Sequence, residues 1–125
     1  MPKTPPTPHD FIPLTPPVFH ILLAISDGAR HGYAVIKEVE KRSQGDVMLS
    51  TGTLYAAMKR LLGDGLIEET DSGKDVVNVD ERRRYYCLTG LGRKVARAEV
   101  NRMVELVSIA EEKRLVRNVA LARGR

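Results

Sequence analysis

All seven prolines of this 125-residue chain lie within residues 2–17. Proline fixes φ and lacks an amide proton, so this stretch cannot form a regular helix or a central strand. We predict an extended arm over residues 1–14, in which Phe11, Ile12 and Leu14 are apolar enough to rest on the body of the protein. A disordered tail fits the same pattern. The rest of the chain contains no proline and is free to form helices and strands.

Composition indicates one folded domain with a modest core, since 42% of the residues are apolar. The formal charge of +4 and the pI of about 9.4 permit an anionic partner but do not require one. The single cysteine, Cys87, cannot form an internal disulfide. The chain has no apolar run near the ~18 residues that span a bilayer, and its start lacks the pattern of a signal peptide. We therefore predict a soluble, cytoplasmic protein.

Two helices are predicted after the arm. Thr15 followed by Pro16 is a favoured start, and the first helix should end near Ser26 with one buried side formed by Phe19, Leu22, Leu23 and Ile25. The second helix should begin at His31-Gly32 and end near Ser43, with helical spacing of Tyr33, Ile36, Val39 and Glu40.

A third helix is predicted from Ser50 or Thr51, either of which can cap it, to the Asp64-Gly65 turn. Its buried stripe repeats at helical spacing and consists of Leu54, Met58, Leu61 and Leu62. At ~100° per residue, the side away from this stripe consists of Gly52, Thr53, Ala56, Lys59, Arg60 and Gly63, with Tyr55 on the flank.

A hairpin and a long helix complete the pattern. Strands are predicted over 66–70 and 82–89, around a turn at 71–75. In the second strand one face should carry Arg84, Tyr86 and Leu88, and the other Arg83, Tyr85 and Cys87. Thr89 should cap the last helix, whose apolar positions include Leu91, Val95, Ala98, Met103, Val104, Val107, Ala110, Leu115 and Val119.

Three helices followed by a hairpin form a winged helix-turn-helix. The predicted fold class is mainly α with a β-hairpin (α+β), with a long C-terminal dimerisation helix. The predicted organisation is a proline-rich arm over 1–14, a DNA-binding domain over 15–89 and a dimerisation helix over 90–125.

Three segments, HGYAVIKEVEKRS, LSTGTLYAAMKRLLGDGLIE and RRRYYCLTGLGRKV, together resemble the PadR family of transcriptional regulators over about residues 18–96. The resemblance implies a winged helix-turn-helix, a homodimer joined through C-terminal helices, and repression through a palindromic operator. Two features depart from the family pattern, since the segment 71–81 carries acids as well as cations and the proline-rich arm lies outside the motif.

The third helix suits the major groove of DNA because its outward side is polar or small. We expect its DNA contacts to be Ser50, Thr51, Thr53, Tyr55, Lys59 and Arg60. Its first backbone amides form a positive helix end suited to a phosphate. The alternative is a helix side that only contacts solvent.

The wing offers further cations, and we expect Lys74, Arg82 and Arg83 to contact DNA. Arg84 could instead brace the hairpin against a helix carboxylate. For two residues at the start of the second helix, the sequence allows either a structural role or a contact with DNA phosphate. Tyr33 is predicted to pack in the core but could touch a phosphate, and His31 is predicted to be a helix cap but could do the same.

The last helix has apolar residues beyond the point where the compact domain can cover them. We expect the dimer interface to comprise Phe19, Met103, Val104, Val107 and Ala110, with the four helix residues meeting the first or last helix of a second chain. The alternative is a helix that folds back on its own domain. A dimer would supply the two half-sites, about one helical turn apart, that specific recognition requires.

The leading hypothesis is a double-stranded DNA-binding repressor, released by a small-molecule effector. The alternative is a winged-helix module that binds another protein and not DNA, which the acids of the wing favour. The scattered histidines and lone cysteine form no catalytic or metal-ligand motif, so we expect no enzyme activity, no cofactor and no metal site.

Overall fold

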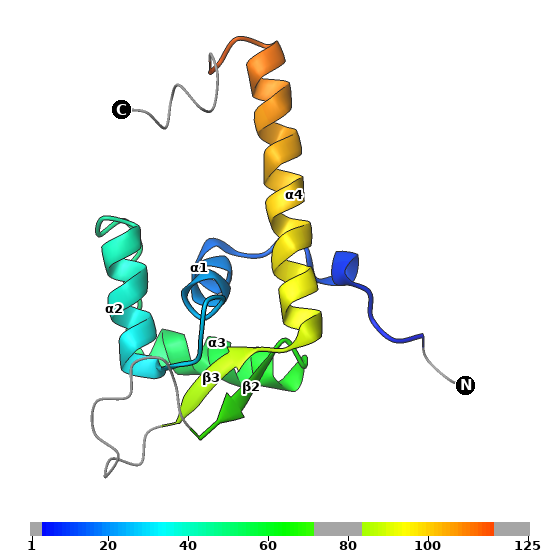
Figure 1. The fold of residues 1–125 in the computed structure, drawn as a ribbon. Helices are drawn as coiled ribbons and strands as arrows, with labels where there is room; N and C mark the ends of the chain where they lie inside the picture. The colour runs from blue at the N-terminus through cyan, green and yellow to red at the C-terminus, as the bar shows by residue number, and fades with distance from the viewer. Residues whose placement is uncertain (1–3, 72–83, 117–125) are drawn as a thin grey trace.

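A computed structural model describes residues 4–71 and 84–116 (Figure 1). In chain order its elements are η1 (Pro8–Phe11), α1 (Pro16–Ala24), β1 (Arg30–His31), α2 (Gly32–Arg42), α3 (Thr51–Gly63), β2 (Ile67–Thr70), β3 (Tyr85–Leu88) and α4 (Gly90–Glu112). The strands form an antiparallel sheet in the order β1-β3-β2. The predicted succession of three helices, a hairpin and a long last helix is confirmed.

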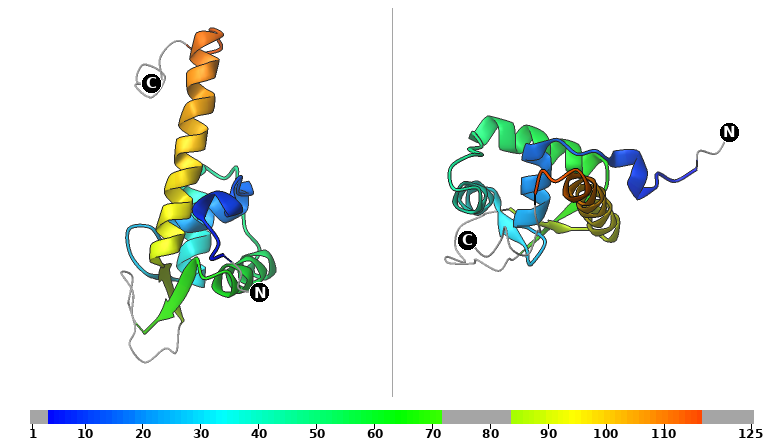
Figure 2. Two further views of the ribbon diagram at one scale, coloured as in Figure 1. Left: turned by 90° about the vertical axis from the view of Figure 1, so that its right-hand side faces the viewer. Right: turned by 90° about the horizontal axis from the view of Figure 1, so that it is seen from above.

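The molecule consists of a body and a projecting helix. The sheet and the helices α1, α2 and α3 form the body, and α4 leaves the sheet and extends well past them (Figures 1 and 2). The distal half of α4 therefore has few neighbours among the described residues of its own chain.

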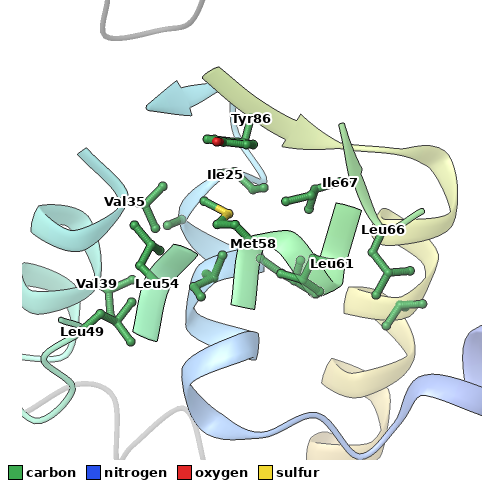
Figure 3. Packing of buried hydrophobic residues seen from close by; sticks show 14 residues of the cluster. Ile25, Val35, Val39, Leu49, Leu54, Met58, Leu61, Leu66, Ile67 and Tyr86 are labelled. Carbon is green, nitrogen blue, oxygen red and sulfur yellow. The ribbon is translucent and has the colours of Figure 1, made fainter. Parts of the chain in front are cut away.

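The core lies between the first three helices and the sheet (Figure 3). The predicted stripe of α3 supplies Leu54, Met58 and Leu61, all buried, whereas Leu62 is only partly buried. The other elements contribute Ile21, Leu22, Ala24, Ile25, Val35, Val39, Leu49, Leu66, Ile67, Tyr86 and Val95. Since all of α3's strongest apolar residues point into this core, its opposite side is left to solvent.

The buried side of α1 was predicted incorrectly for two of its four residues. Leu22 and Ile25 are buried, but Leu23 is exposed and Phe19 is only half-buried. Ile21 and Ala24 occupy the core instead. The helix is apolar almost all round, so its sequence contains no polar side from which the buried side could be inferred.

In α2, the prediction that Tyr33 packs in the core is wrong, because its side chain is 60% exposed. Val35 takes the core position, two residues further along the helix. The prediction that His31 caps the helix is confirmed, since its Nδ1 accepts a hydrogen bond from the Ala34 amide at 3.1 Å.

The sheet has a third strand that the sequence did not reveal. Arg30 and His31 pair with Tyr86 and Tyr85, which makes β3 the central strand. Both tyrosines are buried, although they point to opposite faces, because a central strand next to helices is covered on both sides. The predicted strand over 82–89 is shorter in the structure, and the predicted turn at 71–75 lies almost entirely outside the described residues.

The proline-rich arm lies against the body. Phe11, Ile12 and Leu14 are partly buried against the core, as the sequence suggested. The arm also contains the short 3-10 helix η1, which was not predicted; the Thr7 amide donates to Asp10 Oδ2 at 2.7 Å at its start. After η1, which lies beside α4, the arm crosses α4 and enters α1 (Figure 1).

The first turn of α4 packs directly on the chain that enters β2. Thr89 Oγ1 accepts from the Gly92 amide at 2.9 Å and donates to the Gly65 carbonyl at 2.6 Å, which confirms its predicted role as a cap. A Cβ at Gly92 would collide with the backbone carbonyl of Leu66. Only glycine permits this approach, which fixes where α4 leaves the body.

Glu99 fixes the middle of α4 and is fully buried. Its carboxylate accepts two hydrogen bonds from Arg102, at 2.5 and 3.2 Å, and a third from the Leu14 amide of the arm at 2.8 Å. The guanidinium bonds lower the pKa of Glu99; burial opposes them, and the Leu14 amide adds to the lowering. The charged carboxylate thus joins arm and helix.

Candidate nucleic-acid interface

The start of α3 is held by its own hydroxyl side chains. Ser50 Oγ accepts from the Thr53 amide at 3.1 Å and donates to Thr53 Oγ1 at 2.9 Å. This cap confirms the first of the two residues that the sequence offered for the position. Because the cap uses only one first-turn amide, the remaining amides of that turn point out of the helix end, where an anion can bind them.

The outward side of α3 has the predicted composition. Exposed along it are Ser50, Thr51, Gly52, Thr53, Ala56, Lys59, Arg60 and Gly63. Within residues 4–71 and 84–116, neither Lys59 nor Arg60 forms an ion pair with a carboxylate. The helix therefore presents hydroxyls and small residues in its first turns and unpaired positive charge further along.

Tyr55 lies at the edge of this surface and also has a packing role. Its side chain is 45% exposed. The hydroxyl end of its ring lies against Gly32, the first residue of α2, where a Cβ would collide with it. The start of α2 and the second turn of α3 are therefore in direct contact, an arrangement that depends on glycine at this position.

Three of the predicted DNA-contact residues, Lys74, Arg82 and Arg83, lie outside the described residues. The strand ends on either side of the wing segment are described. Thr70, Tyr85 and His31 face one another in a single row across β2, β3 and β1. The described strand ends that flank the wing segment, Thr70 and Tyr85, thus share a row with His31, the N-cap of α2.

Arg84, at the edge of the described part of the wing, pairs with a strand carboxylate and not with a helix carboxylate. Its Nη1 lies 3.4 Å from Glu69 Oε1 on β2. Both side chains are largely exposed, so this pair contributes little to stability.

The predicted dimer residues occupy the projecting half of α4, apart from Phe19 on α1. Val104 and Val107 are exposed, and Met103, Ala110 and Phe19 are half-buried. The structure adds exposed apolar side chains that were not predicted for the interface: Leu23 on α1, which was predicted to be buried, and Val100, Leu106 and Ile109 on α4. We call the set Val100, Met103, Val104, Leu106, Val107, Ile109 and Ala110 the α4 apolar surface.

Other chemistry is sparse in the part of the chain that the structure describes. That part contains no cluster of three or more histidine, cysteine or acidic side chains able to hold a metal. None of its helices combines the length and apolar character needed to cross a membrane. Burial, followed by the nearby Glu68 carboxylate, raises the pKa of the Cys87 thiol, which disfavours the reactive thiolate.

Comparisons with known proteins agree with this geometry. The model of the PadR-like family of transcriptional regulators matches residues 21–98. A 37.1 kDa protein in transposon TN4556 of Streptomyces fradiae is 33% identical over 86 residues, which are 69% of this chain and 22% of that protein. Protein X of Lysinibacillus sphaericus is 29% identical over 96 residues, 73% of this chain and 81% of the relative.

The chain therefore spans about a fifth of the length of the Streptomyces relative. Among solved structures, a PadR family transcription regulator from Clostridium difficile superposes with a TM-score of 0.62 at 23% identity, covering 76% of this chain and 94% of the other. The region matched by the family model begins within α1 and ends within α4, so the arm lies outside it.

Proposed function

The chain belongs to the PadR-like family of transcriptional regulators, and on that premise we propose that it is a repressor that binds a palindromic DNA operator as a homodimer and is released by a small-molecule effector. The family consists of DNA-binding regulators and not of enzymes. The observation that carries the proposal is the outward side of α3, which is polar or small while every strongly apolar residue of the helix points into the core.

In this proposal α3 is the recognition helix and lies in the major groove. Gly52 and Ala56 allow close approach, and Thr53 and Tyr55 offer hydroxyls to base edges or phosphates. Ser50 and Thr51 stand at the positive helix end, where the free amides suit a phosphate. Lys59 and Arg60 supply charge to the backbone or to bases, supported by their exposure.

The wing extends the contact. We assign Lys74, Arg82 and Arg83 to the DNA backbone or an adjacent minor groove. The assignment is supported by the described root of the wing, which starts in the same row as His31 and Tyr85 and therefore beside α2.

Dimerisation is supported by the α4 apolar surface. The 23 residues of α4 make a helix about 34 Å long at ~1.5 Å per residue, and its distal half projects past the body (Figure 1). A soluble chain rarely leaves such a continuous apolar surface uncovered. At ~100° per residue the surface covers more than half of the helix circumference, which is wider than one partner helix covers.

We therefore place two elements of the second copy on it, its α4 and its α1. The exposed Leu23 and the half-buried Phe19 give α1 an apolar side for this contact. A twofold dimer of this kind presents two α3 helices to two half-sites, as an operator with inverted symmetry requires.

A hollow next to this interface is the place that we propose for an effector. It has a volume of about 350 Å³ and lies between α1 and α2, lined by His20, Leu23, Ala24, Ser26, Asp27, Glu38, Val39 and Arg42. Its size falls in the range of small-molecule sites, and its lining combines apolar side chains with polar and charged ones. A ligand bound here would act on α1 and α2 together and thereby on the spacing of the two α3 helices.

The DNA-binding part of the proposal is tested with the substitution Lys59→Ala. We expect it to weaken binding to duplex DNA from upstream of the protein's own gene by about 1–3 kcal/mol, because it removes an exposed cation from the outward side of α3. Fluorescence anisotropy of labelled duplexes, measured from low to physiological salt, gives both the affinity and its salt dependence.

The matched control is Lys113→Ala, which removes the same charge from the exposed C-cap of α4, at the far end of the molecule. It should leave binding unchanged. If the unaltered protein shows no salt-dependent binding to any duplex, the DNA-binding proposal fails and a protein-binding winged-helix module takes its place. Equal binding by the Lys59→Ala protein removes only Lys59 from the contact.

A further inference from the structure

An aromatic ring and an ammonium group stand exposed together at the start of α2. The side chain of Tyr33 is 60% exposed, although a tyrosine usually buries most of its surface area. Lys37, one turn later, places its Nζ 5.3 Å from the centre of the Tyr33 ring. This cation–π contact favours a position of the positive charge above the ring.

The pair lies directly beside the recognition helix. Gly32, the residue before Tyr33, is the point at which α2 touches the ring of Tyr55 on α3. Tyr55 is in turn one of the residues proposed to contact DNA. A duplex seated on the first turns of α3 would therefore pass close to the start of α2.

The pair also lies beside the root of the wing. The Tyr33 ring stacks with the ring of His31, with centroids 6.5 Å apart and planes 11° from parallel. His31 faces Tyr85 across the sheet, and Tyr85 faces Thr70, the last residue of β2 before the wing. Tyr33 and Lys37 thus lie between the start of α3 and the origin of the wing.

The charge at this place is positive and available. No carboxylate forms an ion pair with Lys37 in the described ranges, 4–71 and 84–116. The neighbouring Glu38 is occupied by Arg42, whose Nε lies 3.0 Å from it, and by Arg30 at 4.0 Å. Among the described residues the charge of Lys37 is therefore not neutralised by a carboxylate.

We propose that Tyr33 and Lys37 form a phosphate-binding pair. It contacts the DNA backbone between the part bound by α3 and the part bound by the wing. The Tyr33 hydroxyl donates a hydrogen bond to a phosphate oxygen, and the Lys37 ammonium forms an ion pair with the same or the next phosphate. This proposal rests on the DNA binding proposed above. Because phosphate contacts are independent of sequence, the pair contributes to affinity and positioning but not to operator choice.

The test uses Tyr33→Phe and Lys37→Ala, with Lys113→Ala as the charge control, and two labelled duplexes: the operator and a scrambled sequence of equal length. We expect each substitution at the pair to weaken binding to both duplexes by the same factor, roughly threefold to tenfold. Lys37→Ala should also lower the slope of log affinity against log salt by about 1, and Tyr33→Phe should not change it.

The outcomes separate this proposal from the one on which it rests. If the unaltered protein binds neither duplex, both proposals are overturned. If it binds and both variants bind as tightly as it does, only the phosphate-binding pair is overturned. A loss confined to the operator also overturns the pair, because it would indicate base recognition. Both side chains are exposed, so thermal melting should confirm that all variants are folded.

Discussion

The substitution Arg102→Met is expected to lower the free energy of unfolding by about 3 kcal/mol at pH 7. Arg102 donates two hydrogen bonds to the fully buried carboxylate of Glu99. Methionine preserves much of the side chain's length but leaves that carboxylate with the Leu14 amide as its remaining donor. Arg102 itself is one-third exposed, so solvent lies close to the Glu99 carboxylate and partly stabilises its charge. The loss should therefore fall at the low end of the range for broken buried pairs.

The pH dependence of this variant should have the opposite sign to that of the unaltered protein. In the unaltered protein Arg102 lowers the pKa of Glu99, so this pair stabilises the fold above the ordinary carboxyl pKa and loses its effect as the pH falls through the lowered value. Without Arg102, burial dominates and raises the pKa of Glu99 above its unfolded value. The variant should therefore gain stability as the pH falls from 7 toward 5.

Urea denaturation at pH 7 and pH 5 measures both the loss of stability of the Arg102→Met protein at pH 7 and its gain in stability toward pH 5. The matched control is the double substitution Glu99→Gln with Arg102→Met, in which the buried group is neutral and can still accept from the Leu14 amide. It should be more stable than Arg102→Met alone and nearly independent of pH over this range. An Arg102→Met protein that is as stable as the unaltered one at pH 7 would show that Glu99 is not held as a buried charge.

The double substitution Val104→Asp and Val107→Asp is expected to produce a monomer and to weaken operator binding by at least about 100-fold. Both valines are exposed in the single chain, Val104 by 59%, so the aspartates cost little there. In the proposed dimer they would bury four unpaired carboxylates, each of which costs several kcal/mol. Sedimentation velocity and anisotropy on the same samples give the mass and the affinity.

The control for this prediction places two aspartates on the polar side of the same helix, Asn101→Asp and Ser108→Asp, where Glu105 and Glu112 already stand. It adds equal negative charge at the same height along α4 and should remain a dimer. A doubly substituted Val104 and Val107 protein that stays dimeric would remove the α4 apolar surface from the interface. Monomers in both variants would indicate that charge, and not the apolar surface, decides assembly.

The parts of the fold that the sequence predicted are those where one local rule decides the outcome. The apolar residues of α3 recur at helical spacing, so its buried side and its outward side followed directly. Ser50, His31 and Thr89 precede helices and accept from first-turn amides, as their side chains favour. The outward side of α3, the central part of the candidate site, was therefore available from the sequence.

The parts that the sequence did not predict depend on contacts distant in the chain. The strand β1 has two residues and exists only because β3 pairs with it. α1 is apolar on all sides, so only the packed structure selects Ile21 over Phe19 for the core. Tyr33 is exposed because Val35 fills the core position on α2, a choice that helical spacing alone left open.

Glu99 was missed although the sequence contains a signal for it. It falls four residues after the buried Val95 and four before Met103, on the side of α4 that faces the body. A lone acid within an apolar stripe predicts a buried charge with a dedicated partner, and Arg102 follows at the spacing of one helical turn. The third hydrogen bond, from Leu14, could not be predicted, because it joins residues 85 positions apart.

Hydroxyl-radical footprinting of the bound operator tests most directly whether two α3 helices, held by one dimer, occupy successive major grooves. We expect two protected stretches of equal strength, related by the symmetry of the sequence and centred about 10 base pairs, or a small multiple of this, apart. In the Lys59→Ala protein the protection of both stretches should weaken to the same extent. A single protected stretch, or two that are lost independently, would contradict this account.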